Sequence, residues 1–202
     1  MNYIDNLISR YPSLAPCRED IEKATNAIVE MHRADGKLLL CGNGGSAADC
    51  EHISGELLKG FISKRPLSNE DLPGVEDEIK ACLQKGIAAV PLSSLSALST
   101  AFLNDVSPEN TFAQLVYALG KKGDMVLGLS TSGNSKNVIV ALKVAKSLGL
   151  KTIAFTGMTG GKLLSLADIT IRVPETETYK VQELHLPVYH AICAEVERII
   201  FG

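Results

Sequence analysis

The sequence predicts an α/β protein in which a five-stranded, mostly parallel sheet is flanked by helices, a three-layer sandwich preceded by an N-terminal helical arm. Short apolar runs alternate five times with segments of helical periodicity along the 202 residues. Two of the runs, at 37–41 and 124–129, are almost continuously apolar, which is typical of strands buried on both faces. Each of these two runs ends in a turn rich in glycine or serine that leads into a predicted helix.

Residues 1–34 form the predicted helical arm. Pro12 and Pro16 separate a short helix at 3–10 from a longer amphipathic helix that ends before the first strand. One face of the longer helix is apolar at helical spacing and carries Ile21, Ala24, Ile28 and Met31. Because the arm precedes the sheet, we expect it to pack on the α/β body or on a partner subunit.

Residues 35–202 are predicted to form a single domain. Its strands are expected at 37–41, 87–92, 124–129, 151–156 and 168–173. Its helices are expected at 46–61, 93–102, 110–119, 137–148, 160–166 and 179–201. The segment 64–85 carries two prolines and many charged side chains. It is predicted to be an exposed insertion with a short helix at 75–84.

The composition argues against several classes of protein. Hydrophobic residues make up 46% and charged residues 21%, as in ordinary globular domains. The formal net charge is −3 without a long basic run, which argues against a nucleic-acid partner. No apolar segment is long enough to span a membrane, and the N-terminus lacks the pattern of a signal peptide. Five scattered cysteines contain no C-x-x-C pair, so no disulfide framework is expected, and the predicted location is cytoplasmic.

The turn after the strand at 124–129 is predicted to bind phosphate. It holds four hydroxyl side chains within six residues: Ser130, Thr131, Ser132 and Ser135. A helix follows directly, and the first N–H groups of a helix lack internal partners and lie at the positive end of its dipole. A polar turn with an N-cap serine is the alternative. The density of hydroxyls favours a loop that follows the oxygens of a phosphate.

The turn after the first strand is a second candidate loop. Residues 42–45 include three glycines, and the loop contains Asn43, Gly44 and Ser46. Such a backbone approaches a ligand closely or adopts positive φ. The loop matches neither a P-loop nor the dinucleotide-binding fingerprint. Together, the two loops predict a ligand held across the carboxyl ends of neighbouring parallel strands.

Five segments occur in an order that resembles a known family. They are CGNGGS at 41–46, HISGE at 52–56, GLSTSGNS at 128–135, TGMTGG at 156–161 and VQELHLPVYH at 181–190. The chain resembles the sugar isomerase (SIS) domain family, and within it the phosphoheptose isomerase branch, over nearly its whole length except about 66–85. The resemblance implies an SIS-type, flavodoxin-like fold. It also implies an aldose–ketose isomerase that converts D-sedoheptulose 7-phosphate to D-glycero-D-manno-heptose 7-phosphate.

Such an isomerase needs a base that removes a proton alpha to a carbonyl and a second group that moves protons at the oxygens through an enediol. His52 and Glu56 share one face of a predicted helix, although any surface helix can carry such a pair. The resemblance implies that Glu56 and His190 are the catalytic acid/base groups. Gln182, on the last helix with His190, resembles a polar residue of the family's site. His185, between them, is expected to be a core or interface side chain.

The same side chains form a possible metal site. Two imidazoles, a carboxylate and an amide oxygen could hold zinc with a position open to substrate. The candidate ligands are His52, Glu56, Gln182 and His190. They are split between two helices far apart in the sequence, so their meeting is implied by the resemblance. With zinc, the carbonyl would be polarised by the ion; without it, His190 would act alone as proton donor.

Other positions leave two interpretations open. The resemblance implies that Asn104 and Asp105 contact substrate, although they could form an ordinary loop dipeptide. The loop at 156–161 could close the site, but we expect it only to connect elements. Three departures from the family pattern concern sugar recognition. Gly60 stands where an arginine is usual, with Lys59 the nearest cation, Tyr179 replaces an aspartate, and the insertion at 64–85 could overhang the pocket.

Two functions are therefore considered. The first is the sugar-phosphate isomerase. The second is a non-catalytic SIS module that senses a phosphosugar or binds a protein partner such as a replication initiator. Initiator-binding relatives lose the equivalents of Glu56 and His190, which this chain keeps, so the enzyme is favoured. The resemblance also implies a homotetramer whose sites combine residues from neighbouring subunits.

Overall fold

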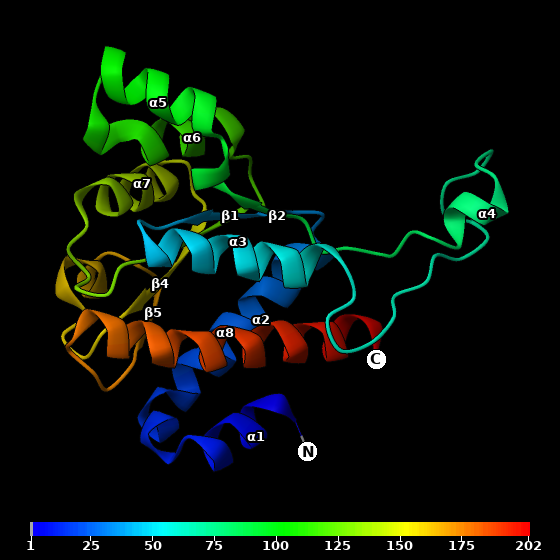
Figure 1. Ribbon diagram of the computed structural model, residues 1–202, viewed down its shortest axis with the longest axis horizontal. Helices are drawn as coiled ribbons and strands as arrows, with labels where there is room; N and C mark the ends of the chain where they lie inside the picture. Colours follow the sequence, from blue (N-terminus) through cyan, green and yellow to red (C-terminus); the bar gives the residue numbers. More distant parts are fainter. Residues whose placement is uncertain (1) are drawn as a thin grey trace.

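The computed structural model describes residues 2–202 and contains one five-stranded sheet in which all neighbouring strands are parallel (Figure 1). The strand order is β2-β1-β3-β4-β5, so the chain reverses its direction across the sheet between β1 and β3. This is the switch point at which open α/β sheets bind ligands, and both candidate loops lie there. The predicted fold class is confirmed. The strands are β1 (Leu38–Cys41), β2 (Ala89–Pro91), β3 (Met125–Leu129), β4 (Lys151–Thr156) and β5 (Ile169–Arg172).

Helices cover both faces of the sheet. One face packs against α2 (Arg18–Arg33), α3 (Gly45–Leu58) and α8 (Thr178–Phe201), and α1 (Tyr3–Arg10) packs outside them on α8 and α2. The other face packs against α6 (Thr111–Leu119) and α7 (Lys136–Ser147), with α5 (Ser96–Asp105) beyond them (Figure 1). Short 3₁₀ turns occupy Pro12–Cys17, Leu92–Ser94, Pro108–Asn110 and Gly161–Ser165. Within residues 2–202, no helix combines the length and apolar character needed to cross a membrane.

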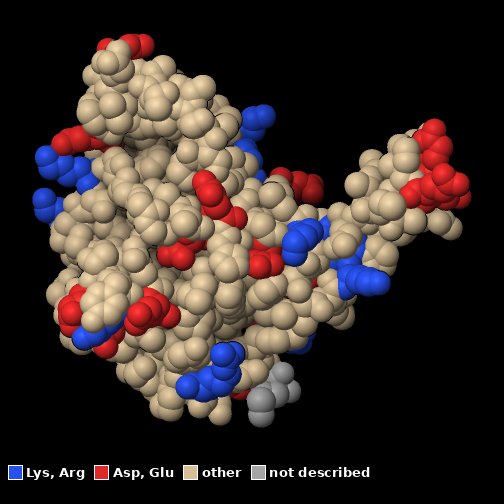
Figure 2. Space-filling view, in the orientation of Figure 1, with Lys and Arg blue, Asp and Glu red and all other residues tan. Residues whose placement is uncertain are grey.

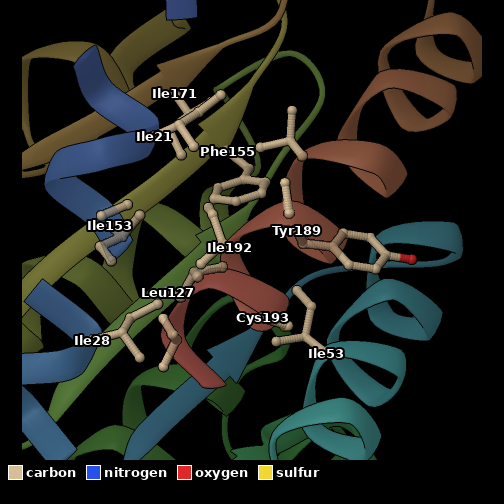
Figure 3. Close-up of a cluster of buried hydrophobic side chains, with 14 of the residues drawn as sticks. Ile21, Ile28, Ile53, Leu127, Ile153, Phe155, Ile171, Tyr189, Ile192 and Cys193 are labelled. Atoms are coloured by element: carbon tan, nitrogen blue, oxygen red, sulfur yellow. The ribbon is translucent and has the colours of Figure 1, made fainter. Parts of the chain in front are cut away.

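Alternate residues of β1 enter two separate hydrophobic cores. Leu38 and Leu40 join the cluster beneath α2, α3 and α8, which Figure 3 shows in part. Leu39 and Cys41 join the cluster beneath α6 and α7. All four side chains are fully buried. The period of two in a strand, with both faces covered, accounts for the continuous apolar run in the sequence.

The apolar face of α2 packs on the sheet of its own chain. The four residues that predicted this face are all buried: Ile21, Ala24, Ile28 and Met31. The N-terminal arm therefore packs on the α/β body, which is the first of the two expected positions.

Helices α3 and α8 lie side by side and run in the same direction (Figure 1). Near their N-termini the side chain of Gln182 lies against Gly45, and two turns later the side chain of Tyr189 contacts His52. The two helices thus stay in register over this length, since both pairs are separated by 137 positions in the sequence. α8 also continues as a helix through Pro187. This register places residues of the HISGE and VQELHLPVYH motifs opposite one another.

The predicted insertion at 64–85, between α3 and β2, projects from the body as a second arm, separate from the N-terminal arm (Figure 1). An antiparallel bridge between Pro66 and Gln84 closes the base of the arm. Its helix, α4 (Asp77–Lys80), is a single turn and shorter than the predicted 75–84. Figure 2 shows acidic side chains gathered at the tip. The arm extends away from the body, so within one chain it does not overhang the candidate site.

Candidate active site

Three side chains from α3 and α8 meet between these two helices. His52 Nε2 lies 3.2 Å from Glu56 Oε1 and 3.3 Å from His190 Nε2. The ligand atoms of the three residues all lie within 4.8 Å of one another. The i,i+4 spacing places His52 and Glu56 on one face of α3. The parallel packing of α8 then brings His190 to the same face.

Two of the three separations among these side chains match those around a tetrahedral metal ion. Zinc bonds of about 2.0–2.1 Å place neighbouring ligand atoms about 3.3 Å apart around a tetrahedron. The separations of His52 Nε2 from Glu56 Oε1 and His190 Nε2, 3.2 and 3.3 Å, are close to that length. Two imidazoles and one carboxylate also leave a fourth position open, as in catalytic zinc sites.

Gln182, the fourth predicted ligand, lies at the loop end of the helix pair. A Cβ on Gly45 would stand 2.7 Å from Gln182 Nε2, so the amide packs against the start of α3. Gly45 precedes His52 by seven residues, or about 10 Å along the helix axis. Gln182 is therefore about two turns away from the three clustered residues. Its place in a metal site stays a prediction.

His190 lies beside an open cavity. Burial lowers the pKa of His190, and the neighbouring His52 lowers it further. A cavity of about 330 Å³ between α1 and α8 has Arg10, Phe61 and His190 in its walls. The Phe61 ring lies 5.5 Å from the His190 ring, measured between centroids. The lowered pKa favours a neutral imidazole, which can offer its lone pair to an ion or exchange a proton with a bound ligand.

The hydroxyls of the 130–135 loop fall into two groups. Ser130 is only 2% exposed, and its Oγ accepts a hydrogen bond from Ser135 N and pairs with Ser135 Oγ. Thr131 and Ser132 remain accessible. Ser135, at the N-cap of α7, makes no capping hydrogen bond with its side chain, and α7 begins directly after the loop. Ser130 therefore shapes the loop, whereas the accessible hydroxyls and the helix N-terminus can bind an anion.

The loop at 156–161 packs closely against the backbone of the 130–135 loop. Gly133 has a φ of 66°, and a Cβ there would lie 2.0 Å from the Gly160 carbonyl oxygen. Leu163 N donates to the Gly133 carbonyl at 3.1 Å. Only glycine allows this close approach with positive φ. The second loop thus holds the first in shape.

The loop after β1 faces the same edge of the sheet. Gly44 has a φ of 55°, as expected for a glycine-rich turn, and Asn43 and Gly44 line a cavity of about 300 Å³. Asn137, at the start of α7, lines the same cavity. Ser46, which was predicted to contact substrate, is only 4% exposed and packs inside the turn. Of the three predicted residues in this loop, Asn43 and Gly44 are therefore accessible.

Asn104 and Asp105 lie in the last turn of α5 and not in a loop. Both are exposed, and Asn104 Nδ2 donates to Asp105 Oδ1 at 2.8 Å. Neither residue lines the two cavities described above. Their contact with substrate therefore stays a prediction.

Sequence reasoning missed a buried ion pair behind Glu56. Arg65 Nε donates to Glu197 Oε1 at 2.8 Å, and both side chains are at most 2% exposed. Arg65 Nη1 also donates to the carbonyl of Leu57, at the end of the helix that carries Glu56. One signal was present, because Glu197 lies in a largely apolar stretch of α8, where a charge is buried only when paired. Lys59 Nζ is 3.6 Å from Glu56 Oε2 and is the cation beside that carboxylate.

Sequence reasoning also missed Tyr189, which contacts His52, and Asp49, which contacts Tyr189. The Tyr189 side chain is buried, and its hydroxyl donates to Asp49 Oδ1 at 3.2 Å and lies 3.0 Å from His52 Nδ1. Burial and the nearby Asp49 carboxylate raise the pKa of Tyr189, so the hydroxyl keeps its proton. Figure 3 shows the Tyr189 ring packed with Ile53 and Cys193.

Comparison with known proteins identifies the family of the chain. The sequence profile of the SIS domain matches residues 2–157, which makes the chain an SIS-domain protein of the α/β class. The phosphoheptose isomerase of Roseiflexus sp. is 41% identical over 174 residues, which are 86% of this chain and 79% of the relative. That of Akkermansia muciniphila is 34% identical over 201 residues, 100% of this chain and 96% of the relative. The chain belongs to the phosphoheptose isomerase family.

Two solved structures have the same fold over nearly their full length. Phosphoheptose isomerase from Francisella tularensis superposes with a TM-score of 0.76 at 30% identity and covers 98% of this chain and 100% of its own. The enzyme from Neisseria gonorrhoeae gives a TM-score of 0.72 at 31% identity and covers 96% and 98%. The family resemblance in the sequence motifs is therefore confirmed.

Proposed function

We propose that this protein is an aldose–ketose isomerase that converts D-sedoheptulose 7-phosphate to D-glycero-D-manno-heptose 7-phosphate. The main support is the cluster of His52, Glu56 and His190 on helices that begin at the edge of the sheet where the candidate phosphate loops lie. His52 is about 10 Å along α3 from the glycine loop. This spacing suits a ligand with a phosphate at one end and a reacting carbon at the other.

In the proposed reaction, Thr131, Ser132 and the N-terminus of α7 hold the phosphate, and Asn43 and Gly44 bind beside it. The Glu56 carboxylate removes the proton from the carbon next to the carbonyl and returns it to the neighbouring carbon. His190 exchanges protons with the substrate oxygens, so that an enediol forms and collapses to the other isomer. The proposed binding region is completed by six further predicted residues: Ser46, Ser130, Ser135 and Gln182, together with Asn104 and Asp105 on α5.

We further propose that His52, Glu56 and His190 hold zinc; Gln182, the predicted fourth ligand, lies about two turns nearer the glycine loop and would have to move to reach the ion. When bound, zinc would polarise the substrate carbonyl. The matching ligand spacings support the three clustered residues.

We also propose a cytoplasmic homotetramer. The exposed arm at 64–85, with Leu72, Ile79 and Leu83 between 43% and 50% exposed, supports contacts between subunits.

The competing function is a non-catalytic module that senses a phosphosugar or binds a protein partner. A phosphosugar sensor needs the phosphate loops, but neither kind of module needs an acid/base pair. The preserved Glu56–His52–His190 cluster therefore favours catalysis.

The test follows sedoheptulose 7-phosphate in deuterated water by proton NMR, with and without zinc. We expect an aldose product with deuterium at C2.

Glu56→Gln should lower kcat by about 10²–10⁴-fold, because the amide cannot act as a base, while binding of the sugar phosphate is retained. Glu51→Gln, on the same helix with an exposed side chain, is the matched control. Binding without turnover or exchange by the unchanged protein would contradict the isomerase and favour the sensor.

A further inference from the structure

The Tyr189 hydroxyl bridges two side chains of α3. Its oxygen lies 3.2 Å from Asp49 Oδ1 and 3.0 Å from His52 Nδ1. Asp49 and His52 are three residues apart, so they lie on one face of α3. Tyr189 comes from α8, and its side chain is 1% exposed. The edge of its ring faces the His52 imidazole at 5.4 Å between centroids. The bridging hydroxyl is therefore shielded from solvent, although the His52 side chain is itself 43% exposed.

A single proton on the Tyr189 oxygen determines how the two contacts are made. An ionised carboxylate can only accept hydrogen bonds. The hydroxyl must therefore donate to Asp49, and its oxygen can then only accept at the other contact. His52 Nδ1 must carry the hydrogen that fills this second bond. The imidazole of a neutral histidine has one N–H, so Nε2 is left with a free lone pair.

The opposite tautomer would block the site. With its hydrogen on Nε2, His52 would donate to Glu56 Oε1, which is only 3.2 Å away. The lone pair of Nε2 would then be lost, and one oxygen of Glu56 would be occupied. Both atoms belong to the cluster that the proposed function requires. The two tautomers thus differ in whether His52 and Glu56 are available to a ligand.

We propose that Tyr189 and Asp49 are positioning residues that hold His52 as the Nδ1–H tautomer and thereby keep its Nε2 lone pair open for a divalent cation. The chain runs from the Asp49 carboxylate through the Tyr189 hydroxyl to His52 Nδ1. It fixes the orientation of the ring as well as its proton. The inference shares His52 with the proposed function, but it concerns the state of the protein before any substrate binds.

The test compares Tyr189→Phe with the unchanged protein in the metal-free state at neutral pH. The chain has four histidines, so histidine labelled with ¹⁵N gives a small set of ring signals, and His52→Gln identifies those of His52. We expect the unchanged protein to show a protonated Nδ1 and an unprotonated Nε2 at His52. In Tyr189→Phe the hydrogen should move to Nε2, where Glu56 accepts it.

Zinc affinity is the second measurement, made by competition with a chromogenic chelator. Removing the group that holds a metal-binding histidine typically weakens affinity by about 10–100-fold, and we expect a loss in that range for Tyr189→Phe. Asp49→Leu should have the same effect, and the double variant should be no weaker than either single variant, because all three break one chain. Tyr117→Phe, at a residue 68% exposed on α6, is the matched control and should change neither measurement.

An unchanged His52 tautomer in Tyr189→Phe would overturn the proposal, and so would additive losses of zinc affinity in the double variant. Neither measurement uses a sugar. If the protein turned over no sugar phosphate while the tautomer still shifted, the isomerase proposal would fail and this one would stand.

Discussion

The side-chain amides of Asn43 and Asn137 form a pair of reciprocal hydrogen bonds. Asn43 Nδ2 donates to Asn137 Oδ1 at 3.0 Å, and Asn137 Nδ2 donates to Asn43 Oδ1 at 2.8 Å. Asn43 belongs to the glycine-rich loop after β1, and Asn137 to the first turn of α7 after β3. Since β1 and β3 are neighbours at the switch point, this pair fixes the spacing of the two candidate ligand-binding loops.

Asn137→Ala should weaken substrate binding by loosening that spacing. The two hydrogen bonds are exposed, so their loss should cost about 1 kcal/mol, or roughly a fivefold rise in the dissociation constant for sedoheptulose 7-phosphate. We expect kcat to change much less, because the acid/base cluster lies on α3 and α8. Calorimetric titration measures the binding, with Asn26→Ala on the outer surface of α2 as control. Unchanged affinity would show that the amide pair does not organise the loops for binding.

Ser130→Ala and Ser132→Ala should have different effects, although both remove a hydroxyl from the same loop. Ser130 is buried and bonded to Ser135, so its loss should lower the free energy of unfolding by about 1–2 kcal/mol. Ser132 is exposed, so its loss should chiefly raise KM. Urea unfolding and steady-state kinetics of the two variants distinguish these roles. The assignment would be wrong if Ser132→Ala lost stability and Ser130→Ala did not.

Glu197→Gln should be among the most destabilising single changes near the site. The carboxylate accepts hydrogen bonds from Arg65 and from the backbone N–H groups of Phe61, Ile62 and Ser63. Removing its charge would leave the Arg65 guanidinium buried without a counter-ion, at a cost of about 3–5 kcal/mol. Urea unfolding measures this, with Glu183→Gln, an exposed position on α8, as control.

Glu197 also gives this change a pH signature. Burial raises the pKa of Glu197, but the three backbone donors and Arg65 outweigh burial and hold the pKa below its usual 4.5. A lowered folded-state pKa stabilises the protein above pH 4.5, and this contribution is lost as the pH falls through the folded-state value. The acid limb of the stability curve should therefore be flatter in Glu197→Gln. An equally steep limb would contradict the assignment.

Local sequence patterns were sufficient to predict the sheet and the two loops. The buried run at 124–129 and the hydroxyl-rich turn after it are determined by neighbours in the chain. The HISGE motif likewise places His52 and Glu56 on one helical face by spacing alone. The meeting of His52 with His190 depends on the packing of α3 on α8, 138 positions apart, and only the family resemblance implied it.

The features that sequence reasoning missed all depend on long-range packing. Arg65 and Glu197 are 132 positions apart, and Tyr189 and Asp49 are 140 apart, so no local spacing connects them. Gln182 illustrates the same limit. Its face on α8 was predictable, but its position against Gly45 depends on the register of two helices. Asn104 and Asp105 were placed outside α5 because a helix end without a clear stop signal is poorly defined by sequence.

His185 should make the stability of the protein depend on pH between about 4 and 6.5. The side chain is fully buried, and its Nε2 lies 3.3 Å from the Thr156 carbonyl oxygen. Its Nδ1 has no partner among the described residues, so a proton there would add a buried N–H without an acceptor. Burial lowers the pKa of His185 from 6.5 to about 4, which agrees with the expected core position.

The sign of the effect follows from proton uptake. Between about 4 and 6.5 the unfolded chain binds a proton at this histidine and the folded chain does not, so stability falls as the pH falls. Over this whole range the loss is on the order of 3 kcal/mol. His185→Gln can still donate to Thr156 and has no titrating group, so its stability should fall less steeply between pH 6.5 and 4. Urea unfolding of both proteins at several pH values measures the two slopes, and equal slopes would show that burial does not lower the pKa of His185 in the folded state.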